Sequence, residues 1–331
     1  MNLFYSIIIP VFNRPQEINE LLYSLLSQDY NKSFEIIIIE DGSTDKSDQI
    51  IKKYQPNLDI KYFFKKNSGP GQSRNFGMQK AKGNYFIILD SDIILPKKYL
   101  SEIDDSLKVN YTEAFAAPDR AHYSFTDIQK AINYAMTSFL TTGGLRNNKG
   151  SQNFQLRSFN MGISKKTFEE TKGFKKQNFG EDIDLSFRIK KIGLSKQFID
   201  SAYVYHKRRT SWSKFYKQTF NFGAARPILN KMYANTAKIT YWFPTVFVTT
   251  FFISLIFLIL KFPVFYFLFV LYFLFLFIHS LWINKNVMVA IYSIQATCMQ
   301  FLGYGFGFLR SQFRLHILKK SNKETFPKMF S

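Results

Sequence analysis

The sequence predicts an α/β fold, with a mostly parallel sheet and helices on both faces, followed by a hydrophobic C-terminal region. Two patterns predict this order. Short runs of β-branched and aromatic residues alternate with longer polar-apolar stretches in the first part of the chain. Acidic and basic residues are mixed up to Asp200, whereas Glu324 is the only acidic residue beyond it. The two parts of the chain therefore suit different surroundings.

The first part predicts strands that alternate with crossover helices. Strand followed by helix followed by strand implies a doubly wound, mostly parallel sheet with helices on both faces. Ligands of such sheets bind beyond the carboxyl ends of the strands, where the strand order reverses. The expected strands are residues 5–10, 34–39, 60–64 and 85–89, and the expected helices are 16–28, 46–54 and 72–81.

Three uncharged stretches follow the basic segment 207–238, at residues 239–260, 262–283 and 287–309. Each is long enough to cross a hydrocarbon layer of roughly 30 Å as a helix of about 20 residues. The first two, separated by Lys261-Phe262-Pro263, predict a helical hairpin. The expected domains are therefore a catalytic or binding domain over 1–235, a transmembrane region over 239–309 and a basic tail over 310–331.

The third stretch is more polar and carries three glycines, at 303, 305 and 307. Three crossings would place the basic tail outside the cell if the first domain lies inside, against the tendency of positive residues to stay inside. An interfacial third segment, with Phe313, Leu315 and Ile317 near the membrane surface, would remove the conflict. Two and three crossings both remain open from the sequence.

The formal net charge of +20 raises the question of a nucleic-acid partner. The basic residues cluster on both sides of the apolar region, however, as cytoplasmic membrane flanks do. We therefore expect a membrane partner and no nucleic acid. The single cysteine, Cys298, excludes an internal disulfide framework and a cysteine-based zinc site. The start of the chain lacks the pattern of an export signal, so we expect the first domain in the cytoplasm.

Asp90 and Asp92 follow the apolar run 86–89, which places two carboxylates at a strand end. Mg²⁺ and Mn²⁺ favour carboxylate and phosphate oxygens, so this pair suits a divalent cation and a diphosphate. A polar turn with a helix cap would use the same residues. His206, after another expected strand, is a candidate third ligand, although a lone histidine is more often structural.

Two further clusters lie where nucleotide chemistry is expected. Asp41 ends the second strand, where its carboxylate could accept a ring N–H of a base, whereas the neighbouring Ser43 and Thr44 suit a helix cap. A glycine-bearing loop with Gly71 and Arg74 opens the third helix and can hold phosphate. It is not a P-loop, because the required Gly-Lys-Ser/Thr sequence is absent.

The segment 180–185 opens another helix with three acidic residues in its first turn. The helix macrodipole favours acids there, which is a sufficient structural reason for them. The same field keeps Asp182 ionised, as a general base that takes a proton from an acceptor hydroxyl must be.

These motifs occur in an order that closely resembles the inverting family 2 glycosyltransferases of GT-A fold, over about residues 5–223. The resemblance rests on Ile-Ile-Pro-Val-Phe-Asn, Glu40-Asp41-Gly42-Ser43, Arg74-Asn75-Phe76-Gly77, Asp90-Ser91-Asp92, Asn160-Met161-Gly162, Gly173-Phe174 and Gly180-Glu181-Asp182. It implies Asp182 as the catalytic base, Asp92 as the principal metal ligand with Asp90 beside it, and nucleotide-sugar binding by Pro10, Phe12, Asn13, Asp41, Gly71, Arg74, Asp90 and Glu181.

The resemblance implies Mn²⁺ or Mg²⁺ as cofactor and a nucleotide-diphosphate sugar as donor, with a uridine diphosphate sugar favoured. The Gln/Arg-x-x-Arg-Trp signature of processive synthases is absent, since the nearest tryptophan is Trp212 in a different setting. This favours transfer of one sugar to a membrane-associated glycan or lipid-linked acceptor, by a multi-pass protein of the inner membrane with a cytoplasmic catalytic domain. The rival interpretations are a nucleotidyltransferase, disfavoured because no glycine-rich loop follows the first strand, and a non-catalytic membrane scaffold.

Overall fold

The computed structural model describes residues 2–143 and 154–330, and the chain divides into two compact units. The N-terminal unit contains Met1–Arg120 and Asn148–Lys207, and the C-terminal unit contains Ala121–Asn147 and Arg208–Ser331. These units do not meet at the expected single boundary near residue 235. The internal segment Ala121–Asn147 belongs with the C-terminal helices.

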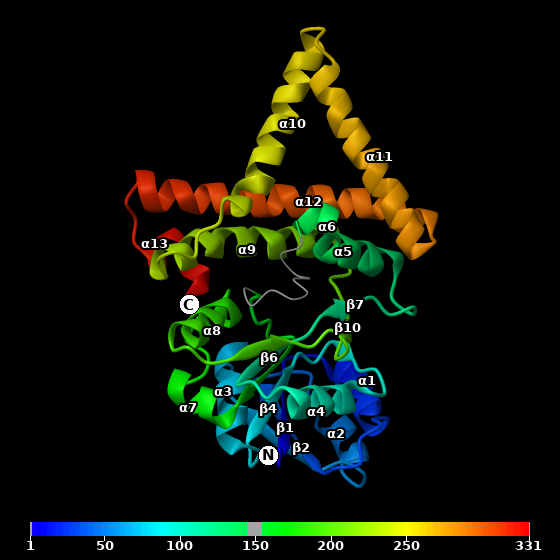
Figure 1. Ribbon diagram of the computed structural model, residues 1–331, viewed down its shortest axis with the longest axis vertical. Helices are drawn as coiled ribbons and strands as arrows, with labels where there is room; N and C mark the ends of the chain where they lie inside the picture. The colour runs from blue at the N-terminus through cyan, green and yellow to red at the C-terminus, as the bar shows by residue number, and fades with distance from the viewer. Residues whose placement is uncertain (1, 144–153, 331) are drawn as a thin grey trace. The chain divides into compact units, whose positions relative to one another are not determined.

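The N-terminal unit is built on a seven-stranded sheet of order β3-β2-β1-β4-β8-β6-β9. Figure 1 labels β1, β2, β4 and β6 of this sheet. Neighbouring strands are parallel except where β8 pairs with β4 and β6. The predicted mostly parallel sheet is confirmed. Its strands are β1 (Tyr5–Val11), β2 (Phe34–Asp41), β3 (Ile60–Lys65), β4 (Tyr85–Leu89), β6 (Ala114–Ala116), β8 (Asn160–Ser164) and β9 (Lys196–Phe198).

Alternate side chains of the central strands enter two separate cores, as the two-residue period of a strand requires. In β1, Ile7 and Ile9 pack with the helices on one face, whereas Ile8 packs with those on the other. Helices α1 (Pro15–Leu26), α2 (Asp48–Tyr54) and α4 (Tyr99–Val109) cover the first face, and α3 (Pro70–Lys80), α7 (Lys165–Thr171) and α8 (Glu181–Lys191) cover the second. The seven predicted strands and helices of this region end within two residues of the observed ones.

A small second sheet completes the N-terminal unit. It has the order β5-β10-β7, from β5 (Ile93–Ile94), β10 (Val204–His206) and β7 (Asp119–Arg120). β10 runs antiparallel to β5, with His206 opposite Ile93. This register brings the end of β10 beside the residues that follow β4.

The C-terminal unit is helical. Its first segment contains α5 (Asp127–Thr137) and α6 (Phe139–Thr142). The chain then returns to the N-terminal unit, and the second segment of the C-terminal unit begins with α9 (Trp212–Met232) and η1 (Ile239–Trp242). Next come α10 (Phe243–Ile259), α11 (Val264–Asn284) and α12 (Val287–Gln312). The chain ends with η2 (Phe313–Ile317), α13 (Asn322–Thr325) and η3 (Pro327–Met329).

Glycines bring α9 and α12 into backbone contact. A Cβ on Gly303 would lie 2.2 Å from Oγ1 of Thr219, one on Gly307 would lie 2.1 Å from the carbonyl oxygen of Phe220, and one on Gly223 would lie 2.1 Å from that of Tyr304. Small residues four apart allow this approach between helices. The glycines that weakened the third hydrophobic stretch as a membrane span therefore serve helix packing.

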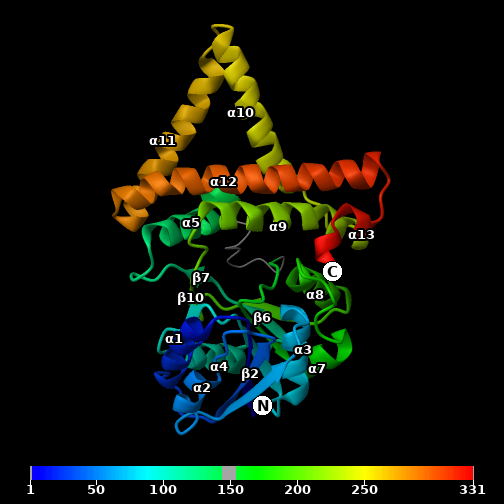
Figure 2. The same cartoon turned by 180° about the vertical axis from the view of Figure 1, so that it is seen from behind.

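The arrangement inside the C-terminal unit distinguishes α12 from the other two apolar helices. The helices α10 and α11 form a hairpin, whereas α12 runs across its base alongside α9 (Figures 1 and 2). By length and composition all three can cross a membrane, over Ile239–Ile259, Val264–Asn284 and Val287–Ile317. The mean hydropathies are 2.1, 2.3 and 1.2, so α12 is the least apolar. The predicted hairpin is confirmed as a structural element.

Candidate active site

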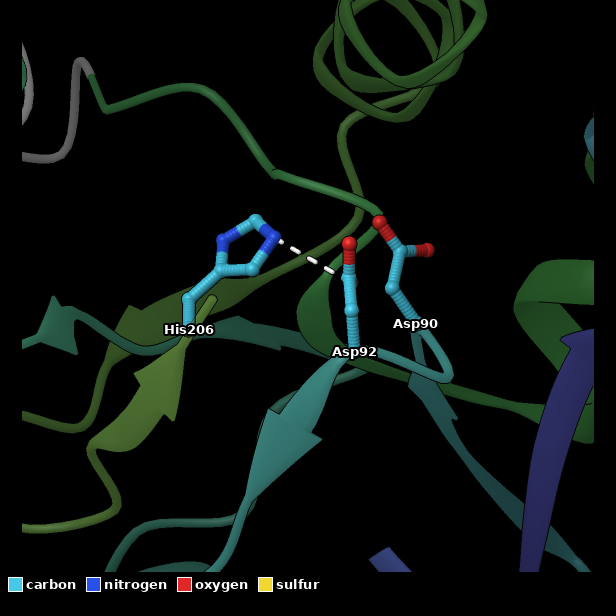
Figure 3. A group of neighbouring side chains, drawn as sticks. All are labelled: Asp90, Asp92 and His206. Carbon is cyan, nitrogen blue, oxygen red and sulfur yellow. Dashed lines mark ion pairs between the residues drawn. The ribbon is translucent and has the colours of Figure 1, made fainter. Parts of the chain in front are cut away.

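The two carboxylates predicted to bind a cation lie directly after β4 (Figure 3). The backbone carbonyl of Asp92 accepts a hydrogen bond of 2.9 Å from the amide of Lys207, next to the paired His206 and Ile93. Pairing of β5 with β10 thus fixes Asp92 and His206 as neighbours. Nε2 of His206 lies 3.3 Å from Oδ1 of Asp92.

Asp90, Asp92 and His206 form a group that could hold a metal ion. One potential ligand atom from each lies within 4.8 Å of the other two. Oδ1 of Asp92 is buried and receives no well-directed hydrogen bond from the residues described here. Two carboxylates and an imidazole suit Mn²⁺ or Mg²⁺ with a phosphate completing the shell. The residues fit the expected group, and their role as ligands stays a prediction.

Arg14 is also part of this group, although the sequence motifs did not single it out. It precedes α1, and its Nη1 forms an ion pair with Oδ2 of Asp92. Burial alone would raise the pKa of Asp92, but His206 and Arg14 hold that pKa well below its ordinary value. Asp92 therefore remains ionised despite its burial.

Arg74 links the Asp90 loop to the start of α8. It is 3% exposed, and its Nη2 donates to Oδ1 of Asp90 at 2.7 Å while Nη1 donates to Oε1 of Glu181 at 3.2 Å. The guanidinium also lies 5.3 Å from the ring centre of Phe174. Arg74 is thus a buried connector of two carboxylates, and its predicted contact with nucleotide stays a prediction.

Gly71, in the first turn of α3, lies close to the same connector. A Cβ there would lie 3.2 Å from Cβ of Phe174 and 3.6 Å from Cγ of Glu181. The position thus tolerates little bulk. The predicted phosphate contact of Gly71 is untested.

Glu181 and Asp182 begin α8, after Gly180 in the left-handed conformation at φ +72°. Burial, reinforced by the charge of Asp182 and opposed by Arg74, raises the pKa of Glu181 to about 7. Asp182 has a more open side chain, 16% exposed, with Oδ2 4.0 Å from Nη1 of Arg157. Its Oδ1 accepts a hydrogen bond of 2.8 Å from the amide of Ile183.

The expected base-binding residues form a second cluster at the carboxyl ends of β1 and β2. Asp41 is 3% exposed and accepts backbone hydrogen bonds of 2.9 Å from both Ser68 and Gly69, besides an ion pair with Lys65. Asp41 therefore fixes the loop before α3. Its contact with a nucleotide base stays a prediction.

Asn13 joins the loops after β1 and β2. Its side-chain oxygen accepts hydrogen bonds from the backbone amides of Thr44 at 2.8 Å and Asp45 at 3.0 Å. The backbone amide of Asn13 donates to Oγ of Ser43 at 2.8 Å. Pro10 lies in β1 opposite Ile39, and Phe12 is 50% exposed just beyond it. Phe12 is thus free to contact a flat ring, whereas Asn13 holds the loops together.

The structure brings most of the predicted residues into one connected group. A path of ion pairs runs from Asp90 through Arg74 to Glu181, which adjoins Asp182 in the chain. The sequence motifs did not predict two residues of this group, Arg14 and Arg157. Arg14 lies four residues after the end of the predicted strand 5–10, and this nearness was an available signal. Arg157 lies in an irregular segment with no such signal.

The model of the family described as Glycosyl transferase family 2 matches residues 6–172. The poly(ribitol-phosphate) beta-N-acetylglucosaminyltransferase TarS of Staphylococcus aureus is 39% identical over 101 residues, which cover 30% of this chain and 18% of TarS. The hyaluronan synthase of Pasteurella multocida is 26% identical over 237 residues, which cover 61% of this chain and 24% of the synthase. The chain spans about a fifth of the length of such curated relatives.

Among solved structures, the mannosyltransferase PcManGT from Pyrobaculum calidifontis, in complex with GDP-Man and Mn²⁺, matches with a TM-score of 0.59 at 14% identity. The match covers 93% of this chain and 88% of that one, and it supports the GT-A-like fold. Half of the chain thus carries the family's sequence pattern on a fold of the expected type, and the chain belongs to glycosyl transferase family 2.

Proposed function

We propose that the chain transfers one sugar from a nucleotide-diphosphate sugar to a hydroxyl of a membrane-associated glycan or lipid-linked acceptor. One observation carries the proposal: Asp90, Asp92 and His206 converge at a strand end that Arg74 connects to the carboxylates of α8. A cation and diphosphate site thus lies within one group with a candidate base, as an inverting displacement requires.

The donor is a nucleotide-diphosphate sugar, with a uridine diphosphate sugar first in order of test. Asp41 would contact the base, with Pro10, Phe12 and Asn13 around it, since all four lie at the ends of β1 and β2. Family relatives include an N-acetylglucosaminyltransferase, and the structural match PcManGT holds GDP-Man. The guanosine donors are therefore the second class to test.

Asp92, Asp90 and His206 would hold Mn²⁺ or Mg²⁺, which when bound stabilises negative charge on the departing diphosphate. Asp182 would take the proton of the acceptor hydroxyl, because it is the more exposed of the two acids that begin α8. Oδ2 of Asp182 lies 4.0 Å from Nη1 of Arg157. Glu181, turned toward Arg74, positions that arginine instead.

The hairpin α10–α11 would cross the membrane twice, with α12 lying along its surface. The transverse course of α12 and its lower hydropathy support this topology over three crossings. The basic tail would then stay on the side of the hairpin's ends, in agreement with the positive-inside tendency. We place the protein in the inner membrane with its catalytic unit in the cytoplasm, acting in cell-surface polysaccharide or glycolipid synthesis.

The test is a screen of nucleotide sugars with the purified full chain, scored by the nucleotide diphosphate released with and without Mn²⁺. We expect one donor to be hydrolysed or transferred, and Asp182→Asn to lower kcat by about a thousandfold while donor binding stays unchanged. Glu169→Gln, an exposed substitution on α7, is the matched control. Donor binding without turnover in the unmodified protein would favour a non-catalytic scaffold and refute the proposal.

A further inference from the structure

Each of the two carboxylates after β4 has its own arginine, and the two arginines are held very differently. Arg74 is 3% exposed and is anchored by a second carboxylate, Glu181, and by the ring of Phe174. The Arg14 side chain is 29% exposed. Among the described residues, Asp92 is the only carboxylate within ion-pair distance of it. Arg14 is therefore the more easily released of the two.

The guanidinium of Arg14 and a divalent cation would compete for the same carboxylate, that of Asp92. Nη1 of Arg14 contacts Oδ2 of Asp92, and Oδ1 of Asp92 faces His206, so both oxygens have a cationic or polar neighbour. A cation on Asp92 would stand directly beside the positive charge of Arg14. In a buried site such like-charge repulsion is weakly screened.

We propose that Arg14 is an exchangeable counter-cation of Asp92, which releases the carboxylate when a divalent cation and a nucleotide diphosphate bind together. The inference rests on the proposed function for the identity of the site. It deepens that function by assigning a residue that makes cation binding depend on nucleotide. A diphosphate brings negative charge that can accept the released guanidinium, since arginine binds phosphate well.

The consequence is a coupling between the two ligands. Without nucleotide, a cation must displace Arg14 and leave its charge without a carboxylate. With nucleotide, the displaced charge has a new partner, so each ligand strengthens the binding of the other. The protein would thus bind a divalent cation weakly without nucleotide and tightly when a donor is bound.

The experiment measures Mn²⁺ binding to the purified full chain by electron paramagnetic resonance, with and without UDP and then GDP. A parallel titration without protein accounts for Mn²⁺ held by free nucleotide. The variants are Arg14→Gln, which removes the charge, and Arg14→Lys, which keeps it. Arg120→Gln is the charge-matched control, because Arg120 stacks at 3.7 Å on the ring of Tyr203 in the small sheet.

In the unmodified protein we expect nucleotide to strengthen Mn²⁺ binding by tenfold or more, in the usual range of about 5- to 150-fold for coupled sites. Arg14→Gln should tighten Mn²⁺ binding in the absence of nucleotide and reduce the coupling to near unity. Arg14→Lys and Arg120→Gln should keep the coupling. A purely structural role of Arg14 would loosen Mn²⁺ binding, not tighten it, and would overturn the inference.

Two negative results can be told apart. If the unmodified protein binds Mn²⁺ with nucleotide, but Arg14→Gln shows the same coupling, the inference fails and the proposed metal site stands. If no Mn²⁺ binds with any nucleotide, and Asp92→Asn changes nothing, the metal site itself fails and the inference fails with it. Thermal unfolding of each variant confirms that the comparison is between folded proteins.

Discussion

Glu181 and Asp182 are adjacent residues whose side chains have different surroundings. Glu181 is buried against Arg74, while the more exposed Asp182 lies near Arg157. Burial and, to a smaller extent, the adjacent charge of Asp182 raise the pKa of Glu181 to about 7.

The raised pKa of Glu181 predicts a pH-dependent stability. The folded protein keeps a proton on Glu181 up to about pH 7, whereas the unfolded chain releases it near the ordinary value of 4.5. This contribution to the free energy of unfolding is therefore full below pH 4.5 and is lost as pH rises to about 7. It amounts to at most about 3.5 kcal/mol, at about 1.4 kcal/mol for each of the 2.5 pKa units between 4.5 and about 7.

Glu181→Gln should consequently flatten the fall of the unfolding temperature between pH 4.5 and 7. The amide keeps the size of the side chain and cannot ionise. Differential scanning fluorimetry across this range, with the exposed Glu169→Gln as control, measures the effect. An unchanged pH profile in Glu181→Gln would mean that Glu181 is ionised in the folded protein throughout.

The acidic members of the site could be found from the sequence, because they follow apolar strands or begin a helix. Asp41, Asp90, Asp92 and Asp182 all lie where strand ends and a helix start were predicted. Their partners could not be found this way. Arg157 comes from an irregular segment, and the pairing of Arg74 with Glu181 joins residues 107 positions apart, so no local pattern records it.

At the scale of elements, the contact between α9 and α12 depends on the absence of side chains at a few positions. Gly307 and Gly305 lie two residues apart in α12 but face different neighbours. A Cβ on Gly307 would lie 2.1 Å from the carbonyl oxygen of Phe220 and 2.9 Å from the amide of Ala224. A Cβ on Gly305 would lie no nearer than 3.2 Å to any neighbour, the closest atoms belonging to Pro244 and Thr245.

We therefore expect Gly307→Ala to destabilise the helix pair by a few kcal/mol, since backbone atoms cannot make room without shifting a helix, and overpacking typically costs about 1–3 kcal/mol. Gly305→Ala should be much closer to neutral, with the same gain of up to about 1 kcal/mol in helix propensity. Thermal unfolding in detergent compares the two. Equal unfolding temperatures would show that α9 and α12 are not packed backbone to backbone.

The first four strands of the large sheet were predictable because each is a short run of β-branched and aromatic residues. The strands β6, β8 and β9 were not predicted, and neither was the course of α12. Its apolar content alone suited either a third crossing or an interfacial position. Gly303 and Gly307 signalled a close helix contact but not with which helix. That information lies in α9, whose basic residues suggested only a membrane flank.

At the scale of the whole molecule, the proposed two-crossing topology predicts which segments share a side of the membrane. Lys261, between α10 and α11, should lie on the far side, whereas Lys285 and Lys319 should both lie with the catalytic unit. The single native cysteine, Cys298, allows a cysteine-free background through Cys298→Ala. New cysteines at the three positions can then be labelled in intact cells with an impermeant maleimide.

Labelling at Lys261→Cys alone is the expected result. Labelling at Lys319→Cys but not at Lys285→Cys would mean three crossings and would contradict the interfacial placement of α12. Lysis before labelling provides the control, because all three positions should then react.

The two compact units do not follow the linear order of the chain. The segment Ala121–Asn147 is inserted between parts of the N-terminal unit yet belongs to the C-terminal one. Ile132, Ala135 and Met136 of α5 pack with Phe215 of α9 and Ala296 of α12. A contact between residues so far apart in the chain leaves no trace in composition.

The packing of α5, α9 and α12 against one another determines how the chain can be shortened for crystallisation. A truncation at residue 235 would keep α5 and α9 but strip away α12, leaving Gly223, Phe215 and their neighbours facing water. Deleting only the hairpin keeps the three-helix cluster whole, provided that the linker from residue 242 to residue 287 is long. Trp242 packs against Phe308 of α12, so the linker must span roughly 30 Å along that helix to reach residue 287. A shortened protein of that kind is the better starting point for crystallisation trials.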